Sequence, residues 1–599
     1  MKRKILWVGL SLLLVVMLVL SSCAKEVTPT TPTAPAAPAA PTAPTTPAAP
    51  AAPAAGEPRY GGNLTFMSDR SLVGGPASFD PAHPSISTIH NWCWPYMESL
   101  IIGDVEKYGP RGTNEFAFRS RGAVPEEYFG GCLAESWEIT QNPIVMTFHI
   151  RPGVMFAAND YIGFEAREVT AYDVEQCFRR NMLDNVAWQS WYYWVDSITA
   201  TDKYTLVVDL NKWFANWTFW LGGGLVLTNI YPPEAVDLAG GNLNGWKSAV
   251  GTGAYIITKY VENSQAVYTR NPDYWDKTII KGKEYQIPFS DTLTYPIILD
   301  ESTAIAALRT GKVDIWNKVP LVYDSTLTNT CPELIKMKAP SDQGHAVQLH
   351  SNAEKSPILS DYKIRQALSI ATDFQTIIHN EYIDGDLIGY PIPRSFTAMY
   401  MDLPDLPEDI QVLYSHNPDL AKQMIADAGY PNGFHMVMNV LSNPYCTDIA
   451  SMLVEQWGKV GVTVEVHVQD SATMLNMHRT ETFDDALLSG ASVGSVFTTL
   501  SKGLMSDPGN DWEDPYEDEL YTTMMSTIDP VERSRLMQVQ SLHRMEYVPY
   551  IYFGNPYILS CYWPWVENYY QEFECGCADP VPILARIWID QDLKKELGY

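Results

Sequence analysis

The chain has 599 residues, too many for a single hydrophobic core, and 46% of them are hydrophobic, as in a folded protein. The formal net charge of −29 at pH 7 excludes an ordinary nucleic-acid-binding protein, which presents a basic surface. The 18 Trp and 34 Tyr supply large aromatic surfaces that can pack a core or stack on a ligand.

The first residues have the three-part pattern of a bacterial export signal. Residues 2–4 are basic, residues 5–20 are almost wholly apolar, and residues 20–23 read LSSC. The apolar run is shorter than the roughly 20 residues that a membrane-spanning helix needs. The LSSC segment resembles a lipobox, which implies cleavage before Cys23 and acylation of its thiol. We expect a signal peptide over residues 1–22 and a lipid on Cys23; the alternative is an ordinary signal peptide with an incidental cysteine.

A tether is predicted over residues 23–58. Between residues 28 and 55 nearly every residue is Pro, Ala or Thr. Such a segment buries too little apolar surface to fold, and its prolines favour extended polyproline II. It would therefore hold a folded body away from a membrane. An O-glycosylated stalk is the alternative.

Strand and helix patterns are mixed through the rest of the chain. Alternating apolar and polar residues predict strands at 144–150, 204–210 and 462–468. Apolar residues at helical spacing predict a helix after Asp361, and a second helix begins with Asn417 as cap and Pro418 at its first position. A third helix is predicted over 447–459. The mixture indicates an α/β class with α+β character.

Eight of the nine cysteines remain once Cys23 is set aside. An even number of cysteines in an exported protein permits disulfides, and the sequence leaves their pairing open. Cys575 and Cys577 are expected to be disulfide partners or a strained pair, because a zinc site needs four ligands.

The folded part carries a series of short motifs. They are YGGNL at 60–64, LAESW at 133–137, TFHIRPGVMF at 147–156, TAYDV at 170–174, VGTGAY at 250–255, RNPDYW at 270–275, ALRTGKVDI at 307–315, IRQAL at 364–368, ADAGY at 426–430 and VPYI at 548–551. In this order they resemble the large extracytoplasmic solute-binding proteins of oligopeptide, dipeptide and nickel ABC transporters. Each motif is weak alone, but their common order over most of the chain is specific.

The resemblance implies a two-lobed periplasmic-binding-protein fold of class II, with an extra subdomain in the first lobe. We place the first lobe at 59–299 with the inserted subdomain at about 98–245, the second lobe at 300–541, and a C-terminal return to the first lobe at 542–599. The two lobes would close over a solute by a hinge motion.

The receptor implied by this resemblance is exported and faces the periplasm or the cell exterior. We expect a monomer that is anchored through Cys23, carries no cofactor and delivers its ligand to ABC permease subunits. No nucleic-acid partner is expected.

Most of the motifs are predicted to serve the scaffold. Gly251 and Gly253 would allow a positive-φ crossover, and residues 151–153 a turn. Residues 273–275 are predicted to form a buried corner rather than a ligand contact.

The ligand contacts are assigned through the resemblance. In peptide-binding relatives one wall of the site follows the first strand and the other follows a Phe-Asp strand, here residues 85–92 and 483–494. The residues assigned to the ligand are Ser87, Thr88, Trp92, Trp94, Arg394, Gly490 and Ser492. Trp191 and Trp194 are further stacking candidates, and a place in the lobe core is the alternative for all four tryptophans.

The second wall departs from the pattern of the resemblance. Members that grip a peptide amine place an Asp there, often behind a Trp, whereas this chain has Gly490 and Val493. Losing that carboxylate would remove a charge-assisted bond worth about 1.5–3 kcal/mol. We therefore expect a sugar, another neutral solute, or a peptide held mainly by backbone contacts.

Other function classes fit single motifs only. Residues 490–494 match the nucleophile elbow G-x-S-x-G, with Ser492 as nucleophile and Asp511, Asp514 and His543 following in hydrolase order. The segment after Ser492 is β-branched and does not predict the required helix, so no catalytic residue is assigned.

A metal or metal chelate, as in nickel-binding relatives, is the remaining ligand alternative. His83 and His90 lie near the presumed cleft, but the chain has no H-E-x-x-H spacing, so no metal ligand is assigned. A purely adhesive surface protein is a third class.

Overall fold

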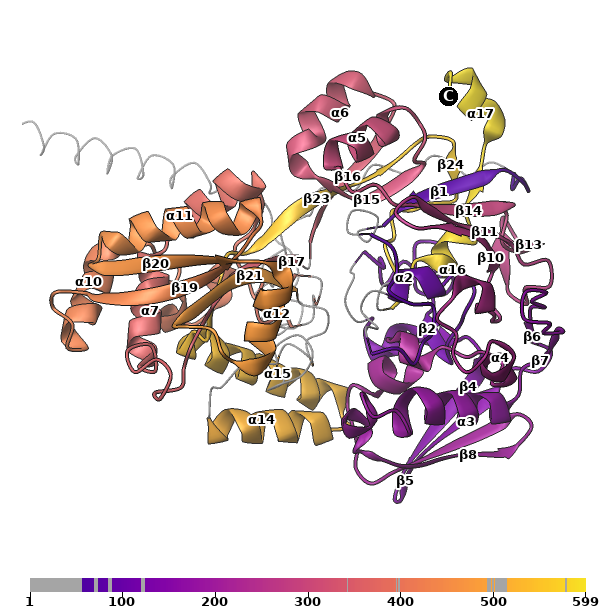
Figure 1. Cartoon of the computed structure of the whole chain (residues 1–599), viewed down its shortest axis with the longest axis horizontal. Helices are drawn as coiled ribbons and strands as arrows, with labels where there is room; N and C mark the ends of the chain where they lie inside the picture. Colours follow the sequence, from indigo (N-terminus) through magenta and orange to yellow (C-terminus); the bar gives the residue numbers. More distant parts are fainter. Residues whose placement is uncertain are drawn as a thin grey trace, which may run out of the picture. The chain divides into compact units, whose positions relative to one another are not determined.

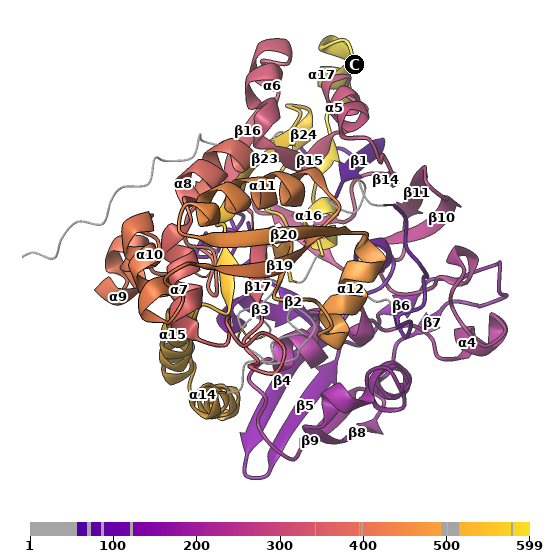
Figure 2. The same ribbon diagram turned by 60° about the vertical axis from the view of Figure 1, so that its left-hand side comes forward.

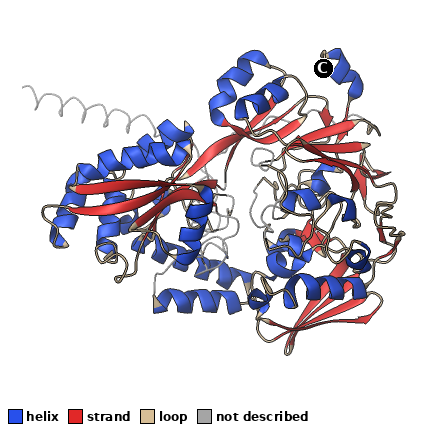
Figure 3. Ribbon diagram, in the orientation of Figure 1, coloured by secondary structure: helices blue, strands red, loops and turns tan. Residues whose placement is uncertain are grey.

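The computed structural model describes residues 57–68, 74–84, 89–119, 124–341, 343–394, 396, 399–492, 497, 500, 514–576 and 579–599. These residues belong to one compact unit and mix helices and strands along its whole length (Figure 3). Among them, no helix combines the length and the apolar character needed to cross a bilayer.

The first large sheet joins the two ends of the folded chain. Its strand order is β10 (Tyr255–Val261), β11 (Gln265–Arg270), β14 (Thr292–Pro296), β1 (Asn63–Met67), β15 (Ile315–Pro320), β23 (Asn555–Tyr562) and β16 (Ile335–Pro340). β1 is parallel to both β14 and β15, whereas β23 is antiparallel to its neighbours (Figure 1). A short strand, β18 (Gly385–Asp386), pairs with the start of β23.

An antiparallel sheet of four strands forms the inserted subdomain. Its order is β4 (Ala134–Gln141), β5 (Ile144–Ile150), β9 (Thr205–Leu210) and β8 (Val195–Asp202). α3 (Ala171–Phe178) packs on β8 and β9 and begins with a capping box between Thr170 and Asp173. The predicted strands at 144–150 and 204–210 are confirmed, and the sheet lies inside the predicted range of 98–245.

Short elements complete this part of the fold. They are the pairs β2 (Ile101–Gly103) with β3 (Phe129–Gly131), β6 (Met155–Phe156) with β7 (Arg167–Glu168), β12 (Lys277–Ile280) with β13 (Lys283–Gln286) and β24 (Val566–Glu567) with β25 (Trp588–Ile589), and the helices α2 (His90–Cys93), α4 (Glu234–Leu238), α5 (Glu301–Arg309), α6 (Asp324–Thr330), α16 (Val581–Leu584) and α17 (Gln591–Glu596).

The second large sheet has helices on both faces (Figure 2). Its order is β20 (Val462–Gln469), β19 (Phe434–Leu441), β21 (Ala486–Ser492), β17 (Gln343–Leu349) and β22 (Tyr550–Tyr552). The accompanying helices are α7 (Tyr362–Ala371), α8 (Phe374–Ile377), α9 (Glu408–Val412), α10 (Pro418–Asp427), α11 (Pro444–Gly458), α12 (Ser471–Thr480), α14 (Pro515–Ser526) and α15 (Pro530–Tyr547). Neighbouring residues of β21 face opposite cores, since Leu488 packs with α7 and α11 and Leu487 with α12.

The helix starts follow the predicted caps. The Asp361 side chain accepts a hydrogen bond from the Lys363 backbone N–H at the start of α7, and Asn417 does the same for Leu420 at the start of α10. The helix predicted over 447–459 is α11, and the strand predicted at 462–468 is β20.

The sheets divide the chain later than we predicted. Residues 300–340 were expected in the second lobe, but β15 and β16 extend the first sheet. The second sheet begins at β17 and ends at β22, so its lobe spans about 343–552 rather than 300–541. Apolar alternation predicts that a strand forms, but not which sheet it joins, and the boundary was therefore misplaced.

Gly251 and Gly253 serve close packing rather than an unusual backbone conformation. Neither has a positive φ, but a Cβ on Gly251 would lie 2.1 Å from the Tyr96 carbonyl oxygen, and one on Gly253 would lie 2.6 Å from that of Pro95. The predicted positive-φ crossover is therefore wrong, although glycine is still required. Gly153, with φ of +79°, forms the predicted turn.

The described cysteines are Cys93, Cys132, Cys177, Cys331, Cys446, Cys561 and Cys575, and all seven are buried free thiols. The disulfides that the cysteine count permits do not form among these seven, and Cys575 is a free thiol rather than the expected disulfide partner. Cys23 and Cys577 lie outside the described residues.

Candidate functional site

Two adjacent segments connect the large sheets. One runs from β16 to β17, and the other runs from β22 to β23. They are hydrogen-bonded to each other, since the Ser341 N–H donates to the Pro556 carbonyl at 2.9 Å and the Phe553 N–H donates to the His345 carbonyl at 3.0 Å. A pair of thin connections of this kind is suited to a hinge.

Two glycines allow the backbones of these connecting segments to approach each other closely where they cross between the sheets. A Cβ on Gly344 would lie 2.4 Å from the Gly554 carbonyl oxygen. Gly554 itself has φ of +80°, and its Cβ would lie 2.3 Å from the Asp386 carbonyl oxygen. The backbones therefore approach more closely than any side chain would permit.

A charged cluster lies beside the crossing, at the start of β23. The Arg394 Nε donates to Asp386 Oδ1 at 3.0 Å, and a terminal nitrogen of the same guanidinium donates to Asp402 at 2.7 Å. The Tyr557 hydroxyl also donates to Asp386, and the Arg394 guanidinium stacks 4.6 Å from the Tyr400 ring centroid. Two carboxylates thus surround one guanidinium, so this cluster does not favour an anionic solute.

An aromatic wall lies at the crossing and is formed by His345, Tyr382 and Tyr445. His345 of β17 packs against both Tyr382 and Tyr445, at ring-centroid distances of 5.9 and 5.3 Å, and the two tyrosine rings also contact each other. Its Nδ1 lies 2.8 Å from the Tyr382 hydroxyl, and burial lowers the pKa of His345 to about 4. The imidazole is therefore neutral at physiological pH.

Gly490 leaves open space next to this wall. It pairs with His345 across β21 and β17, so the two residues share a face of the sheet. Gly490 is exposed, and nothing lies within 4 Å of the position that its Cβ would take. Among the described residues, a side chain at position 490 would therefore extend into open space beside this aromatic group.

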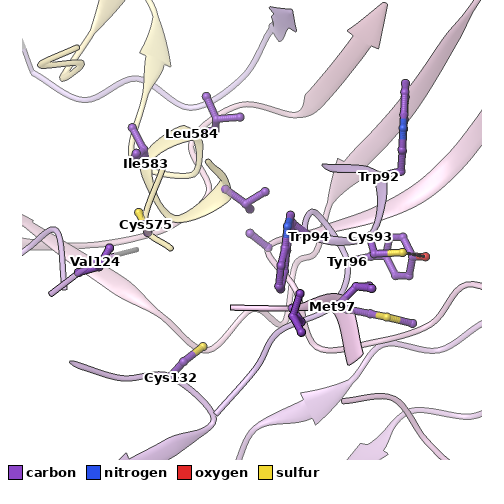
Figure 4. Close-up of a cluster of buried hydrophobic side chains, with 14 of the residues drawn as sticks. Trp92, Cys93, Trp94, Tyr96, Met97, Val124, Cys132, Cys575, Ile583 and Leu584 are labelled. Atoms are coloured by element: carbon purple, nitrogen blue, oxygen red, sulfur yellow. Dashed lines mark hydrogen bonds between the residues drawn. The ribbon is translucent and has the colours of Figure 1, made fainter. Parts of the chain in front are cut away.

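The structure does not bring all the assigned ligand residues together. Trp92 is buried in the core of the first lobe, where its ring packs edge-on against Tyr295 (Figure 4). Trp94 is equally buried but lines a cavity inside the same lobe. Ser87, Thr88 and Val493 lie outside the described residues, and Ser492 is placed only as a residue of β21.

The other two tryptophans also pack against protein. Trp194 is fully buried and stacks on Phe214 at 4.7 Å between ring centroids. Trp191 is partly buried and stacks on Trp220 at 5.3 Å.

The residues that build the wall and the charged cluster were mostly not identified from the sequence. Arg394 was assigned, but Asp386, Tyr382 and Tyr445 carry no local motif. Asp386 lies on β18, Tyr382 on the π-helical turn Ile378–Tyr382 and Tyr445 on α11, and these elements meet only in the folded chain.

The hydrolase residues do not form a catalytic group in the described part of the chain. His543 Nε2 lies 2.7 Å from Asp514 Oδ2, and Asp514 caps α14 through the backbone N–H groups of Tyr516 and Glu517. This arrangement is a helix-end contact. Asp511 and the segment following Ser492 lie outside the described residues.

A metal site is likewise not found among the described residues. Over the described ranges, no group of three or more His, Cys, Asp or Glu side chains is placed to hold a metal ion.

Known proteins resemble this chain over most of its folded part. The sequence model of the bacterial extracellular solute-binding proteins, family 5 Middle, matches residues 129–500. Heme-binding protein A of Haemophilus influenzae is 31% identical over 353 residues, which cover 55% of this chain and 60% of that protein. The periplasmic oligopeptide-binding protein OppA of Salmonella typhimurium is 26% identical over 506 residues, which cover 79% of this chain and 84% of that protein.

Solved structures agree in fold. The periplasmic binding protein DppA of Helicobacter pylori, in complex with the peptide STSA, has a TM-score of 0.68 and 21% identity and covers 89% of this chain and 99% of its own. HbpA2 of Haemophilus parasuis has a TM-score of 0.68 and 22% identity and covers 88% of this chain and 100% of its own. At this level of identity the structures establish the two-lobed fold alone.

Proposed function

Because the chain belongs to the bacterial extracellular solute-binding proteins of family 5, we propose that it captures a solute between its two lobes and delivers it to an ABC importer. The single observation that carries this proposal is the pair of connecting segments between the two sheets, which glycines allow to pack closely together. A ligand that contacts both lobes would shift such a hinge toward a closed form, which the permease subunits can distinguish from the open form.

The solute is an uncharged molecule or a peptide held mainly through its backbone. The wall at His345 is neutral, Gly490 presents no side chain, and the Arg394 guanidinium is already engaged by Asp386 and Asp402. Neither a free amine nor a free carboxylate of a ligand would find a dedicated charged partner among these groups.

A metal chelate is the second candidate. The relative that is 31% identical is named a heme-binding protein, although the aligned part covers 60% of its length. Hemin binding in the cleft would agree with the absence of a three-ligand metal site among the described residues, because the chelator rather than the protein would hold the metal.

The protein acts outside the cytoplasm, as a binding protein rather than an enzyme. We further propose that it is a monomer and that lipid on Cys23 keeps it at the membrane surface.

Mass spectrometry of the gently purified full-length protein tests the solute class, because a tightly held ligand copurifies. Calorimetric titration with a peptide and its N-acetylated form then tests the amine. We expect the two forms to bind within about threefold of each other. A loss of more than about tenfold on acetylation, or 1.4 kcal/mol, would show that an amine clamp exists and would contradict the proposal.

Two further titrations separate the alternatives. Saturable binding of hemin, together with no binding of peptides or sugars, would replace the first candidate by the second. Stoichiometric labelling of Ser492 by a serine-directed phosphonate would instead show an enzyme.

A further inference from the structure

The first lobe contains a cavity of about 360 Å³ that is partly open to solvent and is lined by residues of that lobe alone. Its lining residues come from the segment after α2, from β2 and β3, from the region around β12 and from the segment around α16. None of them comes from the second sheet, so the cavity does not depend on closure of the lobes. Its volume lies within the range of small-molecule sites.

The carboxylate of Glu98 lines the cavity. It accepts hydrogen bonds from the Thr252 hydroxyl at 2.7 Å, the Tyr274 hydroxyl at 2.9 Å and the Trp275 indole N–H at 3.1 Å. The predicted buried corner at 273–275 is thus built around this carboxylate. These donors come from two segments, at residue 252 and at residues 274–275, and together they fix the position of the carboxylate.

One side of the cavity presents hydrogen-bond donors. Trp94 is 1% exposed, and its indole N–H has no partner among the described residues. Arg151 also lines the cavity: its Nε donates to the Cys132 carbonyl at 3.0 Å, and its guanidinium is 4.4 Å from the Trp275 ring centroid. The terminal nitrogens of Arg151 have no protein acceptor within the described ranges. A buried N–H without an acceptor is costly, and a bound carboxylate would satisfy both groups.

Another side presents an acceptor. Asp579 is 5% exposed and lines the cavity, and its Oδ1 accepts the Val581 backbone N–H at 2.8 Å. Burial raises the pKa of this carboxyl, and the neighbouring Glu98 and Glu574 raise it further. A bound ammonium would lower the pKa again and favour the ionised carboxylate.

Carboxylates predominate among the other charged groups of the lining, which are Glu98, Asp104, Glu106, Asp276, Lys277 and Arg586. The Arg586 guanidinium donates to Glu106 and, at 2.8 Å, to Asp276. Lys277 is paired with Glu284 outside the cavity. Trp94 and Arg151 supply donors and Asp579 a buried carboxyl to a ligand in this cavity.

We propose that this cavity binds a small zwitterion of amino-acid size, with its carboxylate on Arg151 and Trp94 and its ammonium on Asp579. The site is separate from the interlobe cleft, and the inference stands whether or not the proposed function does.

Calorimetric titration of the full-length protein with each of the standard L-amino acids is the first test. We expect at least one of them to give a saturable heat with one-to-one stoichiometry. The N-acetyl and carboxamide derivatives of the best binder each lack one charge and should bind at least about tenfold more weakly. If no amino acid gives a saturable heat, the cavity holds water only and the proposal is wrong.

Matched variants locate the site. Trp94→Phe removes the N–H but keeps an aromatic ring, and Asp579→Asn removes the carboxylate charge; each should weaken binding by about tenfold or more. Trp92→Phe is the control, because Trp92 is also 1% exposed and precedes Trp94 by two residues but does not line the cavity. Equal losses in Trp94→Phe and Trp92→Phe would overturn the assignment.

A cleft variant distinguishes this proposal from the previous one. Gly490→Trp fills open space at the end of β21 and should alter binding of the cleft solute while leaving amino-acid affinity unchanged. If Gly490→Trp abolishes amino-acid binding instead, the amino acid occupies the cleft and the cavity carries no site.

Discussion

Burial and hydrogen bonding have opposite effects on the pKa of the Glu98 carboxyl. Burial raises the pKa of this carboxyl from 4.5 to about 7, although Thr252, Trp275 and Tyr274 donate to it. The folded protein therefore binds this proton more tightly than the unfolded chain. The stabilisation that comes from this tighter proton binding is fully present below pH 4.5. It is lost as the pH rises through 7, and the loss amounts to at most about 3 kcal/mol in the free energy of unfolding.

Glu98→Gln should flatten this pH dependence. We expect the free energy of unfolding of the variant, relative to the unmodified protein, to increase between pH 4.5 and 7.5. Urea unfolding at several pH values measures the difference. Glu532→Gln is the control, because the ion pair with Arg535 lowers the pKa of Glu532 and its titration lies below this window. A parallel pH profile for Glu98→Gln would contradict the assignment.

Arg544 and Glu517 form a fully buried ion pair. The Arg544 guanidinium donates to Glu517 and also to the Leu500 carbonyl at 2.9 Å, and Gln540 Nε2 donates to both of these partners. Removing one member of such a pair leaves a buried charge without compensation. The network therefore holds Leu500 against α14 and α15, and breaking the ion pair should strongly destabilise the fold.

Arg544→Met should lower the free energy of unfolding by about 3–5 kcal/mol, as judged from the denaturant midpoint. The double variant Arg544→Met with Glu517→Leu should recover part of the loss, because no charge stays buried. Arg535→Met on the same helix removes an exposed pair with Glu532 and should leave the midpoint unchanged. A double variant as unstable as the single one would contradict this reasoning.

At the scale of elements, the crossing segments depend on glycine. Gly554 combines a φ of +80° with a Cβ position 2.3 Å from the Asp386 carbonyl oxygen. Gly554→Ala should therefore destabilise the protein by about 2 kcal/mol or more. Thermal and urea unfolding measure this effect.

Gly490→Ala is the matched control at the end of β21. Its φ is not positive, and the added methyl group meets open space, so its effect should stay within about 0.5 kcal/mol. Similar losses in the two variants would mean that the close approach at Gly554 is not what requires glycine there.

The sequence predicted elements better than it predicted their partners. α7 and α10 begin at Asp361 and Asn417 because capping is a local interaction. The sheet membership of β15 and β16 depends on long-range pairing with β1 and β23, which leaves no local pattern. The same limit explains why only part of the candidate site was predicted. Gly490 was assigned from the sequence, but its neighbour His345 is brought to it by strand pairing, which leaves no local pattern.

At the scale of the whole molecule, α15 couples the two hydrophobic cores. Leu536 and Met537 pack in the core of the first lobe, whereas Met545 packs in the core of the second. The Arg533 guanidinium of the same helix donates to Glu126 of the first lobe at 2.8 Å. Movement of the lobes must therefore accommodate this helix as well as the two crossing segments.

A receptor of this kind must also stay close to its permease, and the lipid predicted on Cys23 would keep it there. The full-length protein should partition into the detergent phase of a Triton X-114 extract and incorporate labelled palmitate. Cys23→Ser should move it to the aqueous phase and abolish the label. One acyl chain holds a protein only marginally, so the measured mass of the N-terminal peptide should correspond to more than one chain.

Cys331→Ala is the control, because Cys331 is a buried free thiol of the folded part and is not expected to carry lipid. That variant should partition and incorporate label like the unmodified protein. If Cys23→Ser stays in the detergent phase, the association with membranes does not come from acylation of Cys23. The uncleaved apolar run at residues 5–20 would then be the anchor, and the mass of the N-terminal peptide would show it directly.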